Sequence, residues 1–329
     1  KYYVIDPLSQ PADGKITFSG GNTNLAFNIA ENANEFYVGG SARVTFKFRI
    51  IDNNATLTDA GDTYVSPQCG LVGLFSSFDV HNAPTNTLIS SVRNMPRLAS
   101  SLYSVGMADL YDVQTAQQIQ GLSNGTDYNS NNVGVYDLAA NPTELQSYSV
   151  RPVNGCLEQD WYLGSPLMQG NSMKVTLQLA SDGNSLTRIQ APTTNYTYEL
   201  SEVKLVYQTV EGSPEEIKAG RLKSNFVVKY TDMIKQSENR APSSSEVESA
   251  WSSVVNQSDS GEQTFSFKDY NNYITTIQSD NATTNLQLGL GKVSSIFANF
   301  VESSKLNNLT DVDADSNKTY QILDNNDDP

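Results

Sequence analysis

The stretch Gly70-Leu-Val-Gly-Leu-Phe-Ser-Ser-Phe-Asp-Val80 decides how this chain folds. It carries a single charge in eleven residues, and in its second half Leu74, Phe78 and Val80 share one face while polar residues occupy the other. Such a run is typical of a strand that is buried at first and reaches the surface at its end. A strand covered on both faces belongs in the middle of a sheet that a second sheet covers. The stretch therefore predicts an all-β sandwich.

The clearest amphipathic strand lies just before this stretch. Between Ala42 and Ile51, small or apolar side chains occupy every even position, and the odd positions up to Arg49 are basic or polar. A period of two with one apolar face is the pattern of an antiparallel strand that has one buried and one wet side. This run supports the same sandwich.

Weaker strand signals fill most of residues 15–210. Apolar alternation or β-favouring runs predict strands at Lys15–Ser19, Leu25–Ile29, Phe36–Val38, Thr87–Val92, Leu145–Val153, Met173–Leu179 and Tyr196–Val210. In the last run the apolar phase changes near Ser201 and Glu202, which predicts a bulge or a bend. About eight strands with long loops between some of them favour a jelly roll over an up-and-down barrel.

Other segments of the first half are expected to be loops or helix. Residues 52–67 and 121–142 are rich in Asn, Asp, Ser, Thr and Gly, and both are predicted to be long surface excursions. Met95–Val105 has apolar residues near helical spacing, with Pro96 in its first turn and Gly106 after it, so a short helix is predicted there.

The pattern of predicted strands changes after Val210, where Glu211-Gly-Ser-Pro214 ends the last strand of the first half. We expect a first jelly roll over residues 1–212, a linker with a short helix over 213–223, and a second roll over 224–329. Further predictions are a strand at Asn225–Tyr230, a helix at Ser243–Val255, and strands at Thr264–Phe267, Tyr273–Ile277, Leu286–Leu290 and Val293–Val301. Ser243 and Glu246 form the capping box of that helix. Because about five strands are visible where a roll needs about eight, the second core is either compact or partly missing.

Composition restricts the function classes. The chain has 329 residues and a formal net charge of −15, so a nucleic-acid backbone is repelled and no direct nucleic-acid binding is expected. Two cysteines 87 positions apart, Cys69 and Cys156, make neither a disulfide framework nor a metal cluster, and they leave the redox compartment open. No run approaches 18 apolar residues. Both ends look like arbitrary cuts, so we expect the natural protein to extend beyond one or both.

Candidate sites in the sequence are few. His81, the single histidine, has no nucleophile or base placed beside it and is interpreted as a loop residue. The alternating carboxylates Asp311, Asp313 and Asp315 resemble the start of a calcium loop, but Ser316 and Ile322 stand where an EF-hand needs Gly and Glu. They remain weak metal candidates. No catalytic residue and no cofactor are expected, since the sequence has no phosphate loop, serine elbow or zinc spacing.

Several motifs, in chain order, resemble the double jelly-roll major capsid proteins of polinton-like viruses, virophages and their adenovirus and giant-virus relatives. The residues that carry the resemblance are Ile16-Thr-Phe18, Leu25-Ala-Phe27-Asn-Ile29, Phe36-Tyr-Val38, Gly73-Leu-Phe-Ser-Ser-Phe-Asp-Val80, Tyr162-Leu-Gly-Ser-Pro-Leu-Met168, Tyr198-Glu-Leu-Ser-Glu-Val-Lys-Leu-Val-Tyr207 and Ser294-Ser-Ile-Phe-Ala-Asn-Phe-Val301 with Asn307-Asn308. The chain departs from that family at Asn82-Ala-Pro-Thr-Asn86, where an Asn-Gly turn is usual, and in the shortness of its second roll.

The resemblance implies a mechanical function in the virion. It implies two jelly rolls standing side by side in each subunit, and a homotrimer that forms a pseudo-hexagonal block of an icosahedral shell. The implied partners are copies of the same chain, neighbouring capsomers, and vertex and minor capsid proteins, with an internal membrane nearby. No enzyme activity is implied.

Two alternatives remain open. The acidity, the tyrosines, Trp161 and Trp251, and seven Asn-x-Ser/Thr sequons at Asn54, Asn124, Asn195, Asn256, Asn281, Asn308 and Asn317 are also compatible with a secreted or surface carbohydrate-binding β-sandwich. The other alternative is a single jelly-roll vertex (penton) protein with an appended domain. A lectin would bind sugars as a small oligomer, whereas a vertex protein would form pentamers.

Overall fold

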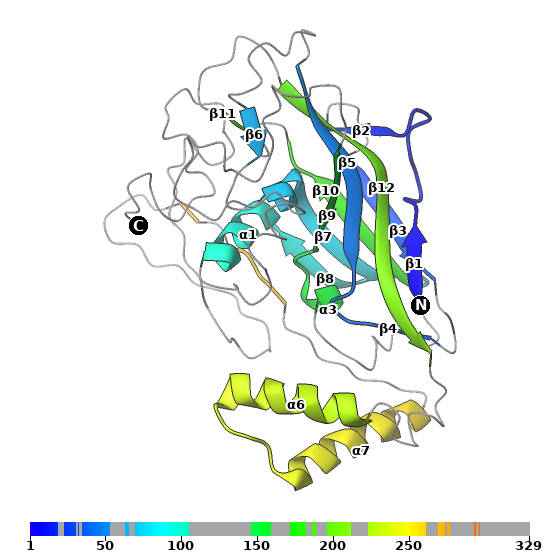
Figure 1. Ribbon diagram of the computed structural model, residues 1–329, viewed down its shortest axis with the longest axis vertical. Helices are drawn as coiled ribbons and strands as arrows, with labels where there is room; N and C mark the ends of the chain where they lie inside the picture. The colour runs from blue at the N-terminus through cyan, green and yellow to red at the C-terminus, as the bar shows by residue number, and fades with distance from the viewer. Residues whose placement is uncertain are drawn as a thin grey trace.

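A computed structural model shows a β-sandwich with a pair of helices at one end (Figure 1). The structure describes residues 1–18, 23–30, 32, 35–52, 63–65, 70–104, 146–158, 172–181, 186–188, 196–211, 223–260, 269–273, 275–276, 293 and 296. The all-β prediction is confirmed, because two antiparallel sheets make up the body and helices are few.

The first sheet is built around one long strand. It consists of β1 (Tyr2–Ile5), β2 (Lys15–Thr17), β4 (Glu35–Tyr37), β5 (Arg43–Asp52), β9 (Gln146–Val150) and β12 (Tyr196–Glu211). Its order is β1-β12-β5-β9. β1 and β2 pair in line along β12, and β4 and β5 do the same. Each of these pairs therefore acts as one interrupted strand.

The second sheet covers the first and contains the second half of the stretch 70–80. Its strands are β3 (Asn24–Ile29), β10 (Met173–Leu179), β7 (Phe75–Asn82) and β8 (Thr87–Arg93), in the order β3-β10-β7-β8. β7 has a strand on each side, as predicted. A further pair, β6 (Thr63–Val65) with β11 (Leu186–Arg188), stands apart from both sheets.

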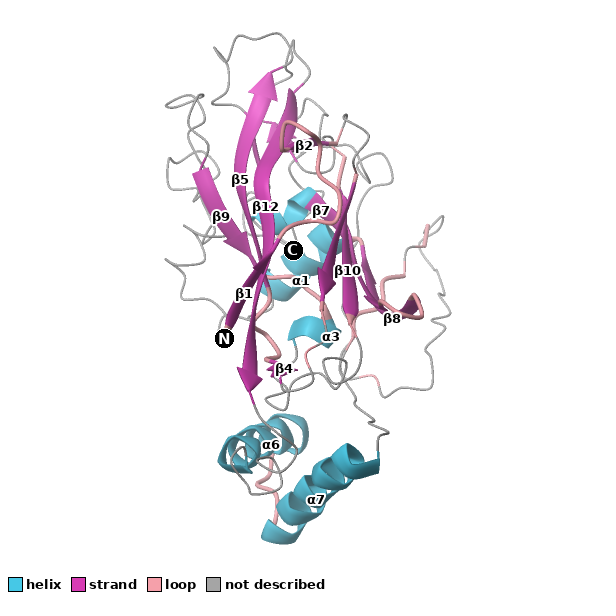
Figure 2. Cartoon of the chain, turned by 90° about the vertical axis from the view of Figure 1, so that its right-hand side faces the viewer, coloured by secondary structure: helices cyan, strands magenta, loops and turns pink. Residues whose placement is uncertain are grey.

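The connections make this sandwich a jelly roll. If each in-line pair counts as one strand, the two sheets contain eight strands among the described residues, in the orders 1-8-3-6 and 2-7-4-5. That arrangement is the double-sheet jelly roll with its two Greek keys. Figure 2 shows the two sheets face to face, with β5 and β12 in one layer and β7 and β10 in the other. The topology therefore shows one complete roll over residues 2–211.

The inner faces of the two sheets make the core. The largest side chains that it encloses completely include Phe27, Phe75, Phe78 and Tyr198. Phe46 of the first sheet meets Phe75 of the second edge to face, with ring centroids 5.9 Å apart. Burial of apolar surface from both layers is the main force that holds the sheets together.

The deciding stretch is not a strand throughout. Gly70–Leu74 forms a short 3-10 helix, η2, whose residues are all buried, and β7 begins only at Phe75. Gly70 has φ of 56°, which favours glycine. The main-chain oxygen of Leu74 still accepts from the amide of Ala180 at 2.8 Å, but the regular pairing of β7 with β10 ends at Phe75. The prediction of a strand from Gly70 on was therefore wrong by five residues.

Three smaller features concern the other predictions for this half. The helix α1 (Met95–Ser104) and the bulge are confirmed: the register of β12 on β5 shifts between Ser201 and Lys204, where Glu202 has φ of 50°. α3 (Gly155–Glu158) was not predicted. Its start is held by Asn154, whose Oδ1 accepts main-chain hydrogen bonds from Cys156 and Leu157.

The segment after the roll begins as a helical hairpin of α6 (Lys223–Glu238) and α7 (Ser244–Ser260). The helix prediction for α7 is confirmed, but the strand predicted at Asn225–Tyr230 was wrong. Phe226 and Tyr230 stack one helical turn apart, with centroids separated by 5.4 Å, and Trp251 lies against Phe226. Apolar residues at every fourth position form one face of a helix. In the sequence, the β-branched residues between Phe226 and Tyr230 favour a strand and hide this spacing.

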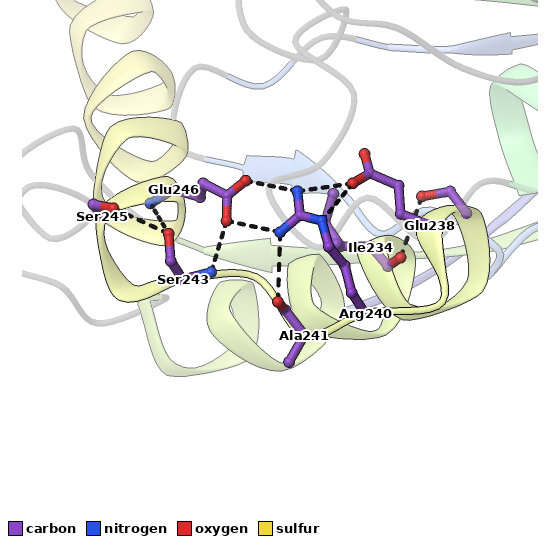
Figure 3. A network of polar contacts seen from close by, with 8 residues as sticks. Ile234, Glu238, Arg240, Ala241, Ser243, Ser245 and Glu246 are labelled. Atoms are coloured by element: carbon purple, nitrogen blue, oxygen red, sulfur yellow. Dashed lines mark hydrogen bonds and ion pairs between the residues drawn. The ribbon is translucent and has the colours of Figure 1, made fainter.

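The turn of the hairpin is closed by a polar network (Figure 3). Ser243 and Glu246 form the predicted capping box, in which Glu246 accepts from the Ser243 amide at 2.7 Å and donates its own amide to Ser243 Oγ at 3.3 Å. Arg240 donates to both oxygens of Glu246 and to Glu238. Hydrogen bonds from Arg240 and Ser243 hold the pKa of Glu246 at about 2.

Several predictions lie outside the described residues. They are the excursion 121–142, the strands at Thr264–Phe267 and Leu286–Leu290, and residues 215–222 of the short helix predicted at Glu215–Lys223, whose last residue begins α6. Of the strand predicted at Tyr273–Ile277, the described residues 273, 275 and 276 belong to no strand.

Candidate assembly surfaces

The outer face of the first sheet carries a row of basic side chains. Arg43, Lys47 and Arg49 alternate along β5, and Lys204 of β12 and Lys15 of β2 extend the row across the sheet. Glu199 lies among them, almost fully buried, 2.9 Å from Arg49 and 3.6 Å from Lys15. Glu202 pairs with Lys47 at 2.5 Å and Asp6 lies 4.0 Å from Lys204, so carboxylates neutralise much of this basic row.

A groove lies at the edge of the same sheet. It has a volume of about 360 Å³ and is lined by Tyr2, Val38, Arg43, Val206, Gln208 and the turn at residues 39–41. Tyr2, which lines it, and Val4 of the same strand are 75% and 57% exposed. β1 is the edge strand of this sheet. Apolar side chains grouped on an edge are typical of a surface that contacts another protein.

Beside this edge, a buried carboxylate ties β1 to β4 and β12. Glu35, 2% exposed, accepts from Lys1 Nζ at 2.6 Å, from Tyr3 Oη at 2.6 Å and from Thr209 Oγ1 at 2.9 Å. Burial raises the pKa of Glu35, but these donors lower it by more, so the pKa stays below its ordinary value. The network fixes the edge strand on the sheet.

The outer face of the second sheet is polar. Asp79 of β7 accepts from Ser91 Oγ at 2.7 Å and pairs with Arg93 at 3.2 Å, and Arg93 also donates to Ser77 Oγ at 3.2 Å. These cross-strand contacts link β7 and β8 side by side. The side chains in these contacts are polar or charged, whereas exposed apolar side chains lie at the edge of the first sheet.

His81 belongs to β7 and not to a loop, which corrects the prediction. It is opposite Lys174 of β10 and Leu88 of β8 in the strand pairing. Its Nδ1 is buried and has no hydrogen-bond partner in the part of the chain that the structure describes. β7 runs two residues beyond Val80, but His81 and Asn82 are both polar and partly exposed, so the sequence gives no alternation that marks this end of the strand.

Cys156 is a buried free thiol in α3, and Cys69 lies outside the described residues. Burial, and then the charge of Asp269, raise the pKa of Cys156 to about 12. A thiol that stays protonated at neutral pH is a poor nucleophile.

The predicted metal candidates Asp311, Asp313 and Asp315 also lie outside the described residues. Among the residues that are described, no three His, Cys, Asp or Glu side chains gather as a metal site. Trp161 is not described, while Trp251 is part of the small core of the hairpin. No helix in the described ranges is long and apolar enough to span a membrane.

The edge strand β1 and the site around Glu35 were missed in the sequence. Tyr2-Tyr-Val-Ile5 is a run of β-favouring residues, and that composition was the available signal. The contact of Glu35 with Thr209 joins residues 174 positions apart, and no local pattern reports it.

Comparison with known proteins gives structural matches only. Neither protein-family models nor curated proteins match the sequence. Solved structures that match include the Sputnik virophage by cryo-EM (10% identity, TM-score 0.42), a quasi-atomic model of the PBCV-1 virus capsid (15%, 0.32) and the mavirus major capsid protein (13%, 0.33). The matches cover 65%, 66% and 65% of this chain and 48%, 44% and 47% of those chains.

The chain thus spans just under half the length of the structures that it matches. The sequence resembles double jelly-roll major capsid proteins, and a virophage, a virus capsid and a major capsid protein are among the solved structures to which the chain is similar in fold.

Proposed function

We propose that this chain is a viral major capsid protein that associates as a homotrimer, and that the trimers tile an icosahedral shell as pseudo-hexagonal blocks. Its role is structural and involves no catalysis. Its partners are other copies of itself, neighbouring capsomers, and vertex and minor capsid proteins, with an internal membrane nearby. Its location is the virion.

One observation carries this proposal, namely the strand order of the roll. The orders β1-β12-β5-β9 and β3-β10-β7-β8 close a complete eight-stranded jelly roll over residues 2–211. Viral capsid subunits are a main class of proteins built on this roll, together with lectins and cupins. The capsid-like motifs of the sequence lie on the same strands: Gly73–Val80 leads into and forms β7, and Tyr198–Tyr207 lies within β12.

One surface feature supports self-association, and the net charge disfavours nucleic acid as a partner. The edge strand of the first sheet presents Tyr2 and Val4 to solvent beside a groove. The net charge of −15 makes direct contact with a genome unfavourable, so a shell of this chain would be faced inside by other proteins or by a membrane. These features favour protein partners over nucleic acid.

The second roll remains part of the proposal. We place the first roll at residues 1–212, the linker at 213–223, and the second roll, compact or incomplete, at 224–329. The helical hairpin of α6 and α7 takes up the start of the last region, so its strands would follow residue 260.

The test is electron microscopy of the purified chain, with class averages by negative stain. Blocks with threefold symmetry and a hexagonal outline are expected. Rings with fivefold symmetry would contradict the proposal in favour of a vertex protein. Single particles without symmetry, together with binding on a glycan array, would contradict it in favour of a lectin.

A further inference from the structure

The chain returns to the roll after the helical hairpin. It leaves the roll at Glu211, forms α6 and α7, and residues 269–273 then lie beside β8, where Figure 1 shows them in orange. Two side chains of this segment contact β8: Asp269 Oδ2 accepts from Ser90 Oγ at 2.8 Å, and Asn272 donates to the main-chain oxygen of Arg93.

The residues of the roll that contact Asp269 are buried, and hydrogen bonds within the roll fix their side-chain orientation. Ser90 is 2% exposed and Asn154 is completely buried. Asn154 Nδ2 donates to Ser90 Oγ at 2.8 Å, so the hydroxyl proton of Ser90 is free to point at Asp269. The Oδ1 of Asn154 is occupied by the amides that begin α3, which fixes the direction of its Nδ2.

The carboxylate has two further main-chain donors. Asp269 Oδ1 accepts from the amide of Tyr270 at 3.0 Å, and the carboxylate also accepts from the amide of Gly155. Tyr270 packs against the core of the roll. β8 is an edge strand of its sheet, so this segment lies against an edge of the sandwich.

We propose that Ser90, Asn154 and the Gly155 amide form a carboxylate-binding site at the β8 edge of the roll, and that residues 269–273 are its ligand. The segment acts as a latch. It fastens the chain beyond the hairpin to the first roll, so that the hairpin is tethered at both of its ends.

The carboxylate is the group on which the latch depends. If the carboxylate of Asp269 is removed while the segment stays in place, the Ser90 hydroxyl loses its acceptor at a position that solvent barely reaches, which carries a desolvation cost. Burial raises the pKa of Asp269 although the hydrogen bonds from Ser90, Tyr270 and Gly155 oppose it. The titratable group that faces it is the thiol of Cys156.

Cys156 provides a natural reporter, because it is 8% exposed in α3 directly after Gly155. The experiment measures two rates in the full chain: alkylation of Cys156 by iodoacetamide, read by peptide mass spectrometry so that Cys69 is counted separately, and amide hydrogen exchange in residues 87–93 and 269–273. The variants are Asp269→Ala, Ser90→Ala and both together, with Ser91→Ala as control. Ser91 is the next hydroxyl on β8, and it bonds Asp79 instead.

We expect Asp269→Ala and Ser90→Ala each to raise both rates by about tenfold, the size of one lost charge-assisted hydrogen bond. The double variant should add little beyond either single change, since both remove the same contact. Ser91→Ala should leave the rates as they are. Asp269→Ala also removes a charge that raises the pKa of Cys156. Ser90→Ala leaves that charge in place, so faster alkylation in this variant reports better access to the thiol.

Two results would overturn the latch. In one, neither single change alters the rates. In the other, amide exchange rises equally along β12 and in the core, which would mean that Asp269 supports the roll as a whole and that the segment does not open by itself.

Discussion

Phe78 shows what a single core residue contributes to the sandwich. Its side chain is completely buried between the two sheets, in the strand that lies between β10 and β8. We predict that Phe78→Ala lowers the free energy of unfolding by about 3–5 kcal/mol, because it removes apolar contacts and leaves a cavity. Urea denaturation followed by far-ultraviolet circular dichroism measures the change.

The matched control for Phe78 is an apolar residue of the next strand. Leu88 of β8 is 50% exposed. Leu88→Ala should change the free energy of unfolding by less than about 1 kcal/mol, as expected for a surface position. A similar loss in both variants would mean that Phe78 is not in the core.

Glu35 gives a pH dependence whose sign follows from its pKa. Because its pKa is lowered in the folded chain, the carboxylate stabilises the fold above the ordinary pKa of 4.5, and this contribution is lost as the pH falls below that value. We predict that Glu35→Gln destabilises the chain at pH 7 and that the difference from the unmodified chain shrinks between pH 5 and about pH 3. Thermal unfolding at a series of pH values measures it.

The control for Glu35 is an exposed carboxylate in an ion pair. Glu202 lies 2.5 Å from Lys47, and its side chain is 61% exposed. Glu202→Gln should have little effect at any pH, since solvent screens such a pair. A difference for Glu35→Gln that stays constant from pH 7 to pH 3 would contradict the role of its charge.

At the scale of elements, β12 is bent at one residue. Glu202 has φ of 50° where the register on β5 shifts, a backbone conformation that costs a residue other than glycine roughly 1 kcal/mol. We predict that Glu202→Gly raises the free energy of unfolding by about 1 kcal/mol, and chemical denaturation measures it. Lys204→Gly, two residues away in the same strand, should lower it, because glycine weakens an ordinary strand position. Destabilisation by both changes would contradict the strain at Glu202.

The sequence predicted elements well where one rule governed a run of residues. The period of two in β5 and β10 and the phase change in β12 each reflect one face of a sheet, so local reading was sufficient. It failed at Gly70–Leu74, where burial is complete but the main chain is helical, because apolar composition does not distinguish the two. It failed again at Asn225–Tyr230, where the face of α6 is defined by Trp251, a residue of another helix.

The candidate site was harder to predict than the fold. Glu35 with Thr209, and Ser90 with Asp269, are pairs separated by 174 and 179 residues. Each contact is made only when the sandwich has closed, and a hydrogen bond of this kind leaves no periodic pattern in the sequence. The edge strand β1 could have been found from its composition, whereas the groove beside it depends on three separate segments.

At the scale of the whole molecule, net charge governs association. Each chain carries −15, so copies repel one another when ionic strength is low. We predict that the trimeric fraction increases between about 0.02 and 0.15 M salt, because the screening length falls to about 8 Å at the higher value. Sedimentation velocity at fixed protein concentration measures this fraction. A trimeric fraction that decreases with salt would indicate that attraction between opposite charges drives assembly.

The native mass of the chain near physiological salt, measured by light scattering coupled to gel filtration, distinguishes a trimer from the alternatives. We expect a stable species at three times 36.0 kDa. A chain that stays monomeric at high concentration, or one that forms a pentamer, would contradict it.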